Sequence, residues 1–362
     1  MATSPVRVRF APSPTGSLHL GNALTAVANR DFADSRGGVM VLRIDDTDAE
    51  RTLAGGEESL RTELEWLGIG WEEGPVRQSE QGDRYAEAAA RALGAGAVGE
   101  ADGSIRLDGI TLVRSDGTAT YQLASVADDL ALGITHIIRG SDHRPNELVQ
   151  QRIARALGAE LPPVIHHGLL LGADGKKLSK RHGHASVADF REAGFPAAAL
   201  RAYLDELALP EHDVLLDESR IGRLAIDAIA SMPDEELEGA AGAPPGLARA
   251  LRGARTLVEA RAIAEQIVSP VLGPLGDDTG PTLERLAELR AASVEQLDEV
   301  GARELVREVK AVGGNLKTVR LALTGAERGA ELWTVLAFLP RDESMARIAV
   351  ALGRSPVTNP DG

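Results

Sequence analysis

Apolar and polar residues alternate near the start of the chain and then take up a helical spacing. Residues 6–10 alternate apolar with basic side chains, which is the pattern of a strand. From Gly21 the apolar positions recur every three or four residues as far as Phe32, and this spacing predicts a helix that ends at Gly37. Residues 39–44 then read as a second, apolar strand. The pattern predicts a strand–turn–helix–strand unit, the core of a parallel α/β sheet.

Strands and helices continue to alternate up to about residue 185. Helical spacing is found at residues 60–67, 85–93 and 146–157, and strand patterns at 110–113 and 164–171. Residues 94–109 form a short insertion that begins as a Gly/Ala-rich connector, and it is too short to bury a core of its own. From Ser186 onward the pattern is mostly helical.

Small and breaking residues suggest where the chain divides. A length of 362 residues makes more than one domain the default expectation. Residues 239–246 are a Gly/Ala/Pro linker and a plausible boundary. We therefore expect an α/β domain over residues 1–185, a helical region over 186–240, a second helical domain over 241–354 and a disordered tail over 355–362.

The composition is that of an ordinary globular protein. No continuous apolar run is long enough to span a bilayer, and the N-terminus lacks a basic-then-apolar signal pattern. These features predict a cytoplasmic protein without a membrane segment. The formal net charge of −15 argues against nucleic-acid binding by the whole surface. A local basic track stays possible, with these candidates: Arg144, Arg152, Arg155, Lys176–Arg181, Arg303, Arg307, Lys310, Lys317 and Arg320.

The absence of cysteine limits the metal chemistry of the chain. Without cysteine there are no disulfides and no thiolate metal sites. The pairs His166–His167 and His182–His184 are the remaining candidate ligands, but no clear acidic or histidine partner set accompanies them. We therefore predict no structural zinc and no resident metal.

The turn after the first strand carries the first chemical motif, Ala11-Pro-Ser-Pro-Thr-Gly-Ser-Leu-His-Leu-Gly-Asn22. It precedes a helix start, where free backbone N–H groups and the helix dipole favour phosphate. His19 can donate a hydrogen bond to a phosphate oxygen as charge builds up, and Gly21 leaves room for a nucleotide close to the backbone. A lone His-x-Gly is more often an ordinary loop, but the surrounding residues from Ala11 to Asn22 favour the phosphate site.

A second motif lies in a loop after the strand at 164–171. Residues 176–182 read Lys-Lys-Leu-Ser-Lys-Arg-His and crowd one loop with positive charge. Such a run is usually a solvated basic loop or a nucleic-acid patch. The strand immediately before it favours a mobile loop whose ammonium groups, those of Lys177 and Lys180 among them, neutralise pyrophosphate as it leaves.

Together the two motifs resemble those of the class I aminoacyl-tRNA synthetases, specifically the glutamyl-tRNA synthetases. Residues 10–22 are similar to their "HIGH" region and residues 177–181 to their "KMSKS" loop. Four further segments also resemble the family, in the family's order: residues 43–48, 121–129, 135–143 and 316–325. The resemblance implies a Rossmann-like catalytic domain over 1–185, then helical regions that contact the tRNA stem and its anticodon.

The resemblance also implies roles for single residues. His19, Gly21, Asn22, Lys177 and Lys180 would be catalytic. Arg9, Ala11, Ser13, Tyr121 and Ser125 would line the glutamate pocket, and Ser125 stands where asparagine is common. Asp45, where many members have glutamate, would hold the substrate's α-ammonium, and Arg139 would pair with its side-chain carboxylate. ATP would be bound by His19, Gly21, Asp142, Leu170 and Lys180.

The chemistry of a dicarboxylic amino acid fits these roles. Its carboxylates need cations, and arginine is the preferred partner because its planar fork meets a carboxylate in two places. Arg9 and Arg139 each lie at the end of an expected strand, beside the edge where parallel sheets bind ligands. Asp128 and Asp129 are interpreted differently, as a pair of charges at a helix start.

Three functions remain open. The first is a compact, monomeric glutamate–tRNA ligase that uses L-glutamate, ATP with Mg²⁺ and tRNA(Glu). The second is a relative that activates glutamate but passes it to a modified tRNA nucleoside or a small amine. The third is a non-catalytic RNA-binding paralogue. The trimmed insertion at 94–109, where the family holds the acceptor stem, favours the second. Residues 316–325 favour the first, which we prefer, and the intact motifs argue against the third.

Overall fold

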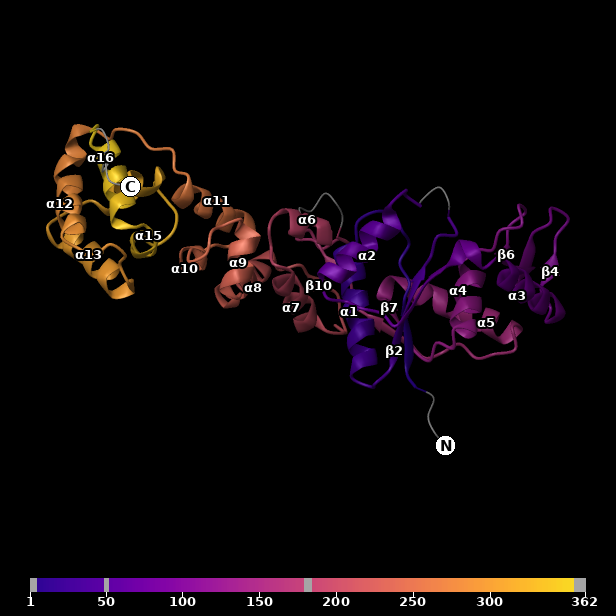
Figure 1. Cartoon of the computed structure of the whole chain (residues 1–362). Coiled ribbons are helices and arrows are strands. Elements are labelled where there is room, and N and C mark those ends of the chain that lie inside the picture. Colours follow the sequence, from indigo (N-terminus) through magenta and orange to yellow (C-terminus); the bar gives the residue numbers. More distant parts are fainter. Residues whose placement is uncertain (1–4, 49–51, 179–183, 355–362) are drawn as a thin grey trace. The chain divides into compact units, whose positions relative to one another are not determined.

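The computed structural model describes residues 5–48, 52–178 and 184–354. The chain forms two compact units (Figure 1). The first comprises Met1–Glu192 and Leu200–Glu218, and the second comprises Ala193–Ala199 and Ser219–Gly362. None of the helices in the described ranges combines the length and the apolarity needed to cross a membrane.

A parallel sheet forms the centre of the first unit. Strands β1 (Arg7–Phe10), β2 (Val39–Ile44) and β3 (Glu73–Arg77) pair in parallel in the order β1-β2-β3. Strand β7 (Ile137–Gly140) pairs in parallel with β8 (Val164–His167), and the Thr135 N–H donates to the Arg7 carbonyl at 2.9 Å. Helix α1 (Leu20–Asp34) lies beside β2 and β7 (Figure 1). The predicted parallel α/β fold is confirmed.

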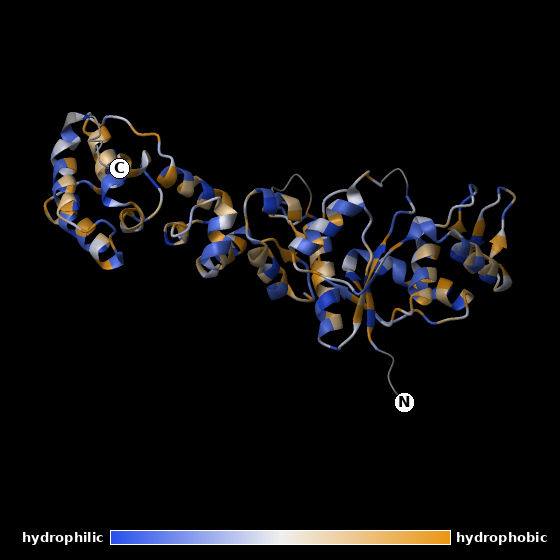
Figure 2. Ribbon diagram, viewed as in Figure 1, coloured by the Kyte–Doolittle hydropathy of each residue, from blue (hydrophilic) through white to orange (hydrophobic). Residues whose placement is uncertain are grey.

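The central strands carry buried charges as well as apolar side chains. Figure 2 shows both hydrophobic and hydrophilic residues in this region. Val8, Met40 and Leu42 are fully buried core residues. Arg9 and Arg43 lie on the same strands and are 6% and 1% exposed. A buried arginine is costly unless it is paired, so these strands must supply partners for their guanidinium groups.

The short insertion has more structure than its sequence predicts. Strands β4 (Val98–Gly99), β5 (Ile105–Leu107) and β6 (Ile110–Val113) form a small antiparallel sheet. One apolar cluster joins it to helices α3 (Gly82–Gly94), α4 (Tyr121–Ala131) and α5 (Arg144–Ala156). The insertion therefore shares the core of the first unit, which explains how so few residues can hold a sheet.

The single strand expected at residues 164–171 is wrong. The segment forms β8 and a separate β9 (Leu170–Leu171), which pairs with β10 (Val214–Leu215). The Gly168 N–H turns aside to donate to the Pro210 carbonyl at 2.7 Å. A Cβ on Gly168 would lie 1.9 Å from the His212 carbonyl oxygen, so this close passage requires glycine.

The remaining regular elements of the first unit, and those of the second within the described residues, are helices. In the first unit and at its border they are α2 (Gly56–Trp66), η1 (Gln78–Glu80), η2 (Ser141–His143), α6 (Val187–Glu192) and α7 (Ala197–Leu207). In the second they are α8 (Glu218–Ser231), α9 (Asp234–Ala241), α10 (Ala248–Leu251), α11 (Leu257–Val268), η3 (Asp277–Thr279), α12 (Gly280–Ala291), α13 (Glu299–Ala311), α14 (Leu316–Thr324), α15 (Leu332–Phe338) and α16 (Arg341–Ala351).

One apolar core runs through the second unit, from Ile229 to Ala351. It continues across the expected linker at 239–246, where α9 ends on Gly242 in the left-handed conformation. The division into domains at residues 185, 240 and 354 therefore stays a prediction. The tail predicted to be disordered, 355–362, lies outside the described residues.

Candidate functional site

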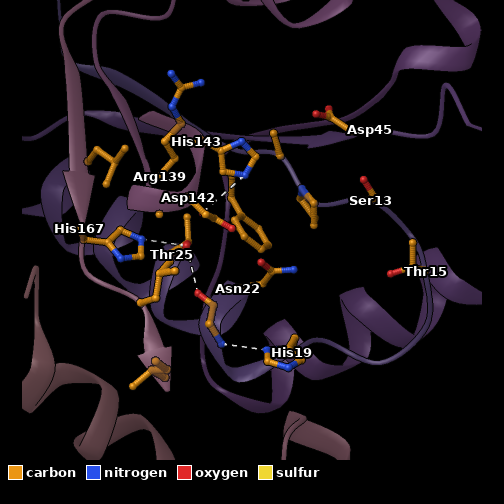
Figure 3. Close-up of a pocket in the computed structure, with 18 of the residues that line it drawn as sticks. Ser13, Thr15, His19, Asn22, Thr25, Asp45, Arg139, Asp142, His143 and His167 are labelled. Atoms are coloured by element: carbon orange, nitrogen blue, oxygen red, sulfur yellow. Dashed lines mark hydrogen bonds and ion pairs between the residues drawn. The ribbon is translucent and has the colours of Figure 1, made fainter. Parts of the chain in front are cut away.

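A cavity of about 560 Å³ opens at the carboxyl ends of the parallel strands, beside the start of α1. Figure 3 shows side chains from the β1–α1 turn, from α1 and from the ends of β2, β7 and β8 around this space. The cavity brings together twelve of the residues predicted for the site: Arg9, Ala11, Ser13, His19, Gly21, Asn22, Asp45, Tyr121, Arg139, Asp142, Leu170 and Lys177.

Two predicted site residues stand apart from this set. Ser125 does not line the cavity, because it is 2% exposed and lies behind Arg43, whose Nη2 donates to the Ser125 hydroxyl at 3.3 Å. The structure thus places Ser125 outside the cavity wall, and its role in binding glutamate stays a prediction. Lys180 falls among residues 179–183, outside the described part of the chain.

His19 caps the N-terminus of α1. Its Nδ1 accepts a hydrogen bond from the Gly21 N–H at 3.4 Å, so the proton of a neutral ring sits on Nε2. Burial lowers the pKa of His19; a hydrogen bond with the Leu178 backbone opposes this shift, and the nearby Lys177 charge adds to it. A neutral imidazole that keeps an Nε2–H donor at a helix start is suited to hydrogen-bond an anionic oxygen.

A second histidine is linked to the same turn through α1. The Thr25 hydroxyl lies 3.1 Å from the Gly21 carbonyl and 2.9 Å from His167 Nε2 (Figure 3). His167 Nδ1 lies 2.8 Å from the Gly168 carbonyl, so it is the nitrogen that donates. Burial lowers the pKa of His167. Thr25 of α1 thus contacts the end of β8 through His167.

Behind the cavity lies a buried network of charges. Asp129 accepts from Arg9 Nε at 3.1 Å and from Arg43 Nη1 at 2.8 Å. Arg43 also forms a bidentate pair with Asp45: its Nε and Nη2 donate to the two Asp45 carboxylate oxygens at 2.6 and 3.1 Å. Although burial opposes it, the carboxylates of Asp45, Asp129 and Asp128 raise the pKa of Arg43 well above its ordinary value. Each of these guanidinium groups therefore has its own counter-charge.

Asp128 extends this network, and its predicted role is wrong. Asp128 and Asp129 lie near the end of α4, not at a helix start, and they are 0% and 2% exposed. Asp128 accepts from Gln78 Nε2 at 2.9 Å, Arg84 Nη1 at 2.7 Å and the Tyr85 hydroxyl at 2.9 Å. Because its carboxylate accepts hydrogen bonds from three side chains, Asp128 has a structural role: it connects α4 to α3 and η1.

Arg139 differs from the other buried arginines of the site. Its Nη1 donates to Gln150 Oε1 at 2.7 Å and its Nε to His166 Nε2 at 3.3 Å, and both partners are neutral acceptors. Its Nη2 is buried without a hydrogen-bond partner. Within residues 5–48, 52–178 and 184–354 no carboxylate forms a salt bridge with it, and burial lowers its pKa. The cavity thus contains a cation without a salt-bridge partner among the described residues, although the charges of Asp129 and Glu147 act on it from a distance.

Lys177 brings the second motif to the opposite side of the cavity. Its Nζ lies 2.5 Å from Asp142 Oδ2, and its side chain is 65% exposed. Although burial opposes it, this ammonium lowers the pKa of Asp142. The two residues hold the start of the basic loop against the end of β7.

The predicted site did not include Arg43, Thr25, His143 and His167, all of which line the cavity, although His167 was considered as a metal ligand. Arg43 carried a usable signal, because a charged residue inside an apolar strand needs a buried partner. His143 and Thr25 had no comparable signal, since their place depends on which helices meet the sheet. Among the described residues, no group of three His, Cys, Asp or Glu side chains is placed to hold a metal ion.

Comparison with known proteins agrees with the geometry. The family described as class I tRNA synthetases (E and Q), catalytic domain, matches residues 5–101 and 95–215. A glutamate–tRNA ligase from Rubrobacter xylanophilus is 36% identical over 422 aligned positions, which cover 95% of this chain and 97% of that protein. A glutamate–tRNA ligase from Maricaulis maris is 32% identical and covers 95% of this chain and 99% of that protein.

Solved structures give the same fold. A crystal structure of a glutamate tRNA ligase from Elizabethkingia meningosepticum, in complex with its amino acid, has a TM-score of 0.80 and 21% identity. The match covers 97% of this chain and 99% of that chain. The alignment with the Rubrobacter protein is longer than the 362 residues of this chain, so that relative contains segments that are missing here.

Proposed function

Because the chain belongs to the class I tRNA synthetases of the glutamate and glutamine (E and Q) family, we propose that it is a glutamate–tRNA ligase. It uses ATP to activate L-glutamate and then transfers the glutamyl group to the 3′ end of tRNA(Glu). The relatives of that name align along almost the whole chain, which supports the complete reaction over activation alone.

The observation that carries this proposal is Arg139. Arg139 is 6% exposed, has no salt-bridge partner among the described residues and leaves Nη2 without a hydrogen bond. The free-energy cost of burying its guanidinium is therefore not offset within the described residues. A ligand carboxylate in the cavity would supply that counter-charge through charge-assisted hydrogen bonds. The side-chain carboxylate of glutamate is the proposed ligand. A substrate with a neutral side chain would leave the burial of Arg139 without a counter-charge.

The first step joins glutamate to AMP. An α-carboxylate oxygen attacks the α-phosphorus of ATP, the bond to the β-phosphate oxygen breaks, and pyrophosphate leaves with the electron pair. Mg²⁺ enters with ATP as part of the substrate. His19 and the start of α1 would donate to the phosphate oxygens, and Lys177 and Lys180 would offset the charge of the leaving pyrophosphate. Asp142 and Leu170 line the same cavity beside the expected nucleotide.

The buried network would orient the other end of glutamate. Asp45 lines the cavity while Arg43 fixes both of its oxygens, so the proposed partner of the α-ammonium is held rigidly. Arg9 lines the cavity but already faces Asp129, which makes it a weaker carboxylate ligand than Arg139. Ser125 would act on glutamate only through Arg43.

The second step transfers the glutamyl group. A ribose hydroxyl at the 3′ end of tRNA attacks the acyl carbon of glutamyl-adenylate, and AMP leaves. We propose that the helical segments 186–240 and 241–354 contact the tRNA stem and anticodon, as the family resemblance implies. The monomeric state and the cytoplasmic location stay predictions from the sequence.

The test is aminoacylation with labelled glutamate, ATP and total tRNA. The proposal expects base-labile label at the 3′ end of tRNA. Base-stable label, or label on a small molecule only, would instead favour transfer to another acceptor, and absence of any adenylate would remove the enzyme assignment.

The role of Arg139 is tested by Arg139→Ala in glutamate-dependent exchange of pyrophosphate with ATP, with tRNA present. We expect at least a 100-fold loss, on the order of magnitude of losing one or more charge-assisted hydrogen bonds in a buried site. Arg91→Ala, on the exposed face of α3, is the matched control and should keep the wild-type rate. An unchanged rate in Arg139→Ala would refute the role.

A further inference from the structure

Arg139 is held by two neutral side chains, Gln150 and His166, and not by a carboxylate of the described residues. We propose that Gln150 is a specificity-determining residue, because its neutral amide oxygen holds Arg139 without cancelling the charge that selects glutamate over its amide, glutamine. The inference rests on the proposed function. It concerns a residue of α5 that does not line the cavity and that the site predictions did not include.

The first support is the contrast among the three buried arginines of the site. Arg9 and Arg43 each form a salt bridge with Asp129, at 3.1 and 2.8 Å. Arg139 is equally buried, at 6% exposed, yet in the described parts of the chain its side-chain partners are an amide and an imidazole. A buried guanidinium without a carboxylate is unfavourable in the free protein, so it is expected where a ligand brings the missing charge.

The second support is the geometry of the two acceptors. Gln150 is 2% exposed, and its Oε1 accepts from Arg139 Nη1 at 2.7 Å. His166 Nε2 accepts from Arg139 Nε at 3.3 Å, and only the neutral ring can do so. Burial lowers the pKa of His166, with a further contribution from Arg139. Two donor positions are thus fixed, while Nη2 is buried without a partner.

The nearest acid on α5 is kept away from the guanidinium. Glu147 lies on the far side of the imidazole, 3.6 Å from His166 Nδ1, and is 34% exposed. Its charge is screened by solvent and reaches Arg139 only across the ring. Gln150 therefore occupies the position where a carboxylate would neutralise Arg139, and glutamine differs from glutamate at that position by one charge and almost no volume.

Glutamate and glutamine as substrates differ by the same single change. A carboxylate substrate gains from the uncompensated guanidinium, whereas an amide substrate leaves it without a counter-ion. With a carboxylate at position 150 the guanidinium would be paired, and a substrate carboxylate would meet a like charge a few ångströms further on. The preference for glutamate would then shrink or reverse.

The experiment is Gln150→Glu in the full chain, assayed by pyrophosphate–ATP exchange with tRNA present and with glutamate or glutamine as substrate. A like charge at about 5–6 Å in a medium of effective dielectric constant near 20 corresponds to a loss on the order of 100-fold in kcat/KM for glutamate. We expect the loss to fall mainly on KM, with glutamine unchanged or improved. The measured quantity is the ratio of kcat/KM for the two substrates.

Two variants separate charge from shape and position. Gln150→Met removes the acceptor but adds no charge, so glutamate activity falls while the preference over glutamine is kept. Gln151→Glu adds the same charge one residue along α5, where the half-buried Gln151 faces Glu147. This variant should stay within about threefold of wild type, because solvent that reaches a half-buried charge screens it. If Gln150→Glu does not fold, Gln150→Asp carries the test, with the same direction and a smaller shift.

The outcomes are distinct. A collapse of the substrate ratio in Gln150→Glu, with the ratio kept in Gln150→Met, supports the inference. An unchanged ratio in a folded Gln150→Glu, or an equal change in Gln151→Glu, overturns it while leaving the proposed function intact. A wild-type protein without glutamate-dependent exchange would instead overturn the proposed function.

Discussion

The buried charge network allows a quantitative test with the substitution Asp129→Asn. Asp129 is 2% exposed and forms salt bridges with both Arg9 and Arg43. The change keeps the shape of the side chain but removes one negative charge from between two guanidinium groups. Arg9 then loses its carboxylate partner, and Arg43 keeps Asp45 as its close one.

The expected cost follows from the burial of the partners. Breaking a buried ion pair by removing one member typically costs about 3–5 kcal/mol, because the remaining charge is left uncompensated. Asp129 has two partners, both at most 6% exposed, so we expect a value near the top of that range. For a unit of about 200 residues, each kcal/mol lowers the melting temperature by roughly 2–4 °C. The predicted decrease is therefore about 10–15 °C.

Thermal unfolding followed by circular dichroism measures this effect. Glu73→Gln is the matched control, because it removes a carboxylate from the Arg7–Glu73 salt bridge, in which Glu73 is 47% exposed. An exposed pair contributes at most about 1 kcal/mol, so this variant should melt within a few degrees of wild type. Equal melting temperatures for the two variants would refute the reasoning that burial makes the Asp129 network costly to break.

Two further predictions concern pH and the basic loop. Burial lowers the pKa of His19 and His167 below that of the unfolded chain, near 6.5, so the unfolded state binds more protons at acid pH. Their contribution to the free energy of unfolding is complete above about pH 6.5 and is lost as the pH falls below it, by at most about 1.4 kcal/mol per pH unit for each group. A melting temperature that increases as the pH is lowered from 7.5 to 5.5 would contradict this. Lys177→Ala removes an exposed ion pair with Asp142 and should change stability by less than about 1 kcal/mol, yet slow pyrophosphate–ATP exchange by about 10–100-fold if the ammonium faces the leaving group. Lys177→Arg keeps the charge and should keep most of the rate, and a folded Lys177→Ala with normal exchange would remove it from the mechanism.

Much of the site could be predicted because its residues sit in short sequence segments. The β1–α1 turn and the first turn of α1 carry Ala11, Ser13, His19, Gly21 and Asn22 in one short segment, and all five line the cavity. The order of strand, loop and helix fixes such positions locally, since the loops at the carboxyl ends of parallel strands meet at one edge. The same reasoning located Asp45 and Arg139 at strand ends.

Pairings between distant residues could not be predicted in this way. Asp129 was interpreted as part of a helix-start charge pair, whereas it lies 120 residues from its partner Arg9 and is buried against it. Ser125 was expected in the cavity wall but supports Arg43 from behind. The strand expected at 164–171 breaks at Gly168 because of the backbone of residues 210–213. Each difference depends on contacts between segments far apart in the chain.

The sequence by itself determined the parallel α/β unit, the helical C-terminal half, the lack of thiolate chemistry and the two loops that carry the motifs, because periodicity and residue type act over a few neighbours. Only the tertiary structure decided which charges are paired. Arg9, Arg43 and Arg139 look alike along the chain, but the packing of α4 gives two of them a carboxylate, and α5 gives the third an amide. That difference in buried counter-charge separates the two arginines that are paired within the fold from the one proposed to bind a substrate carboxylate.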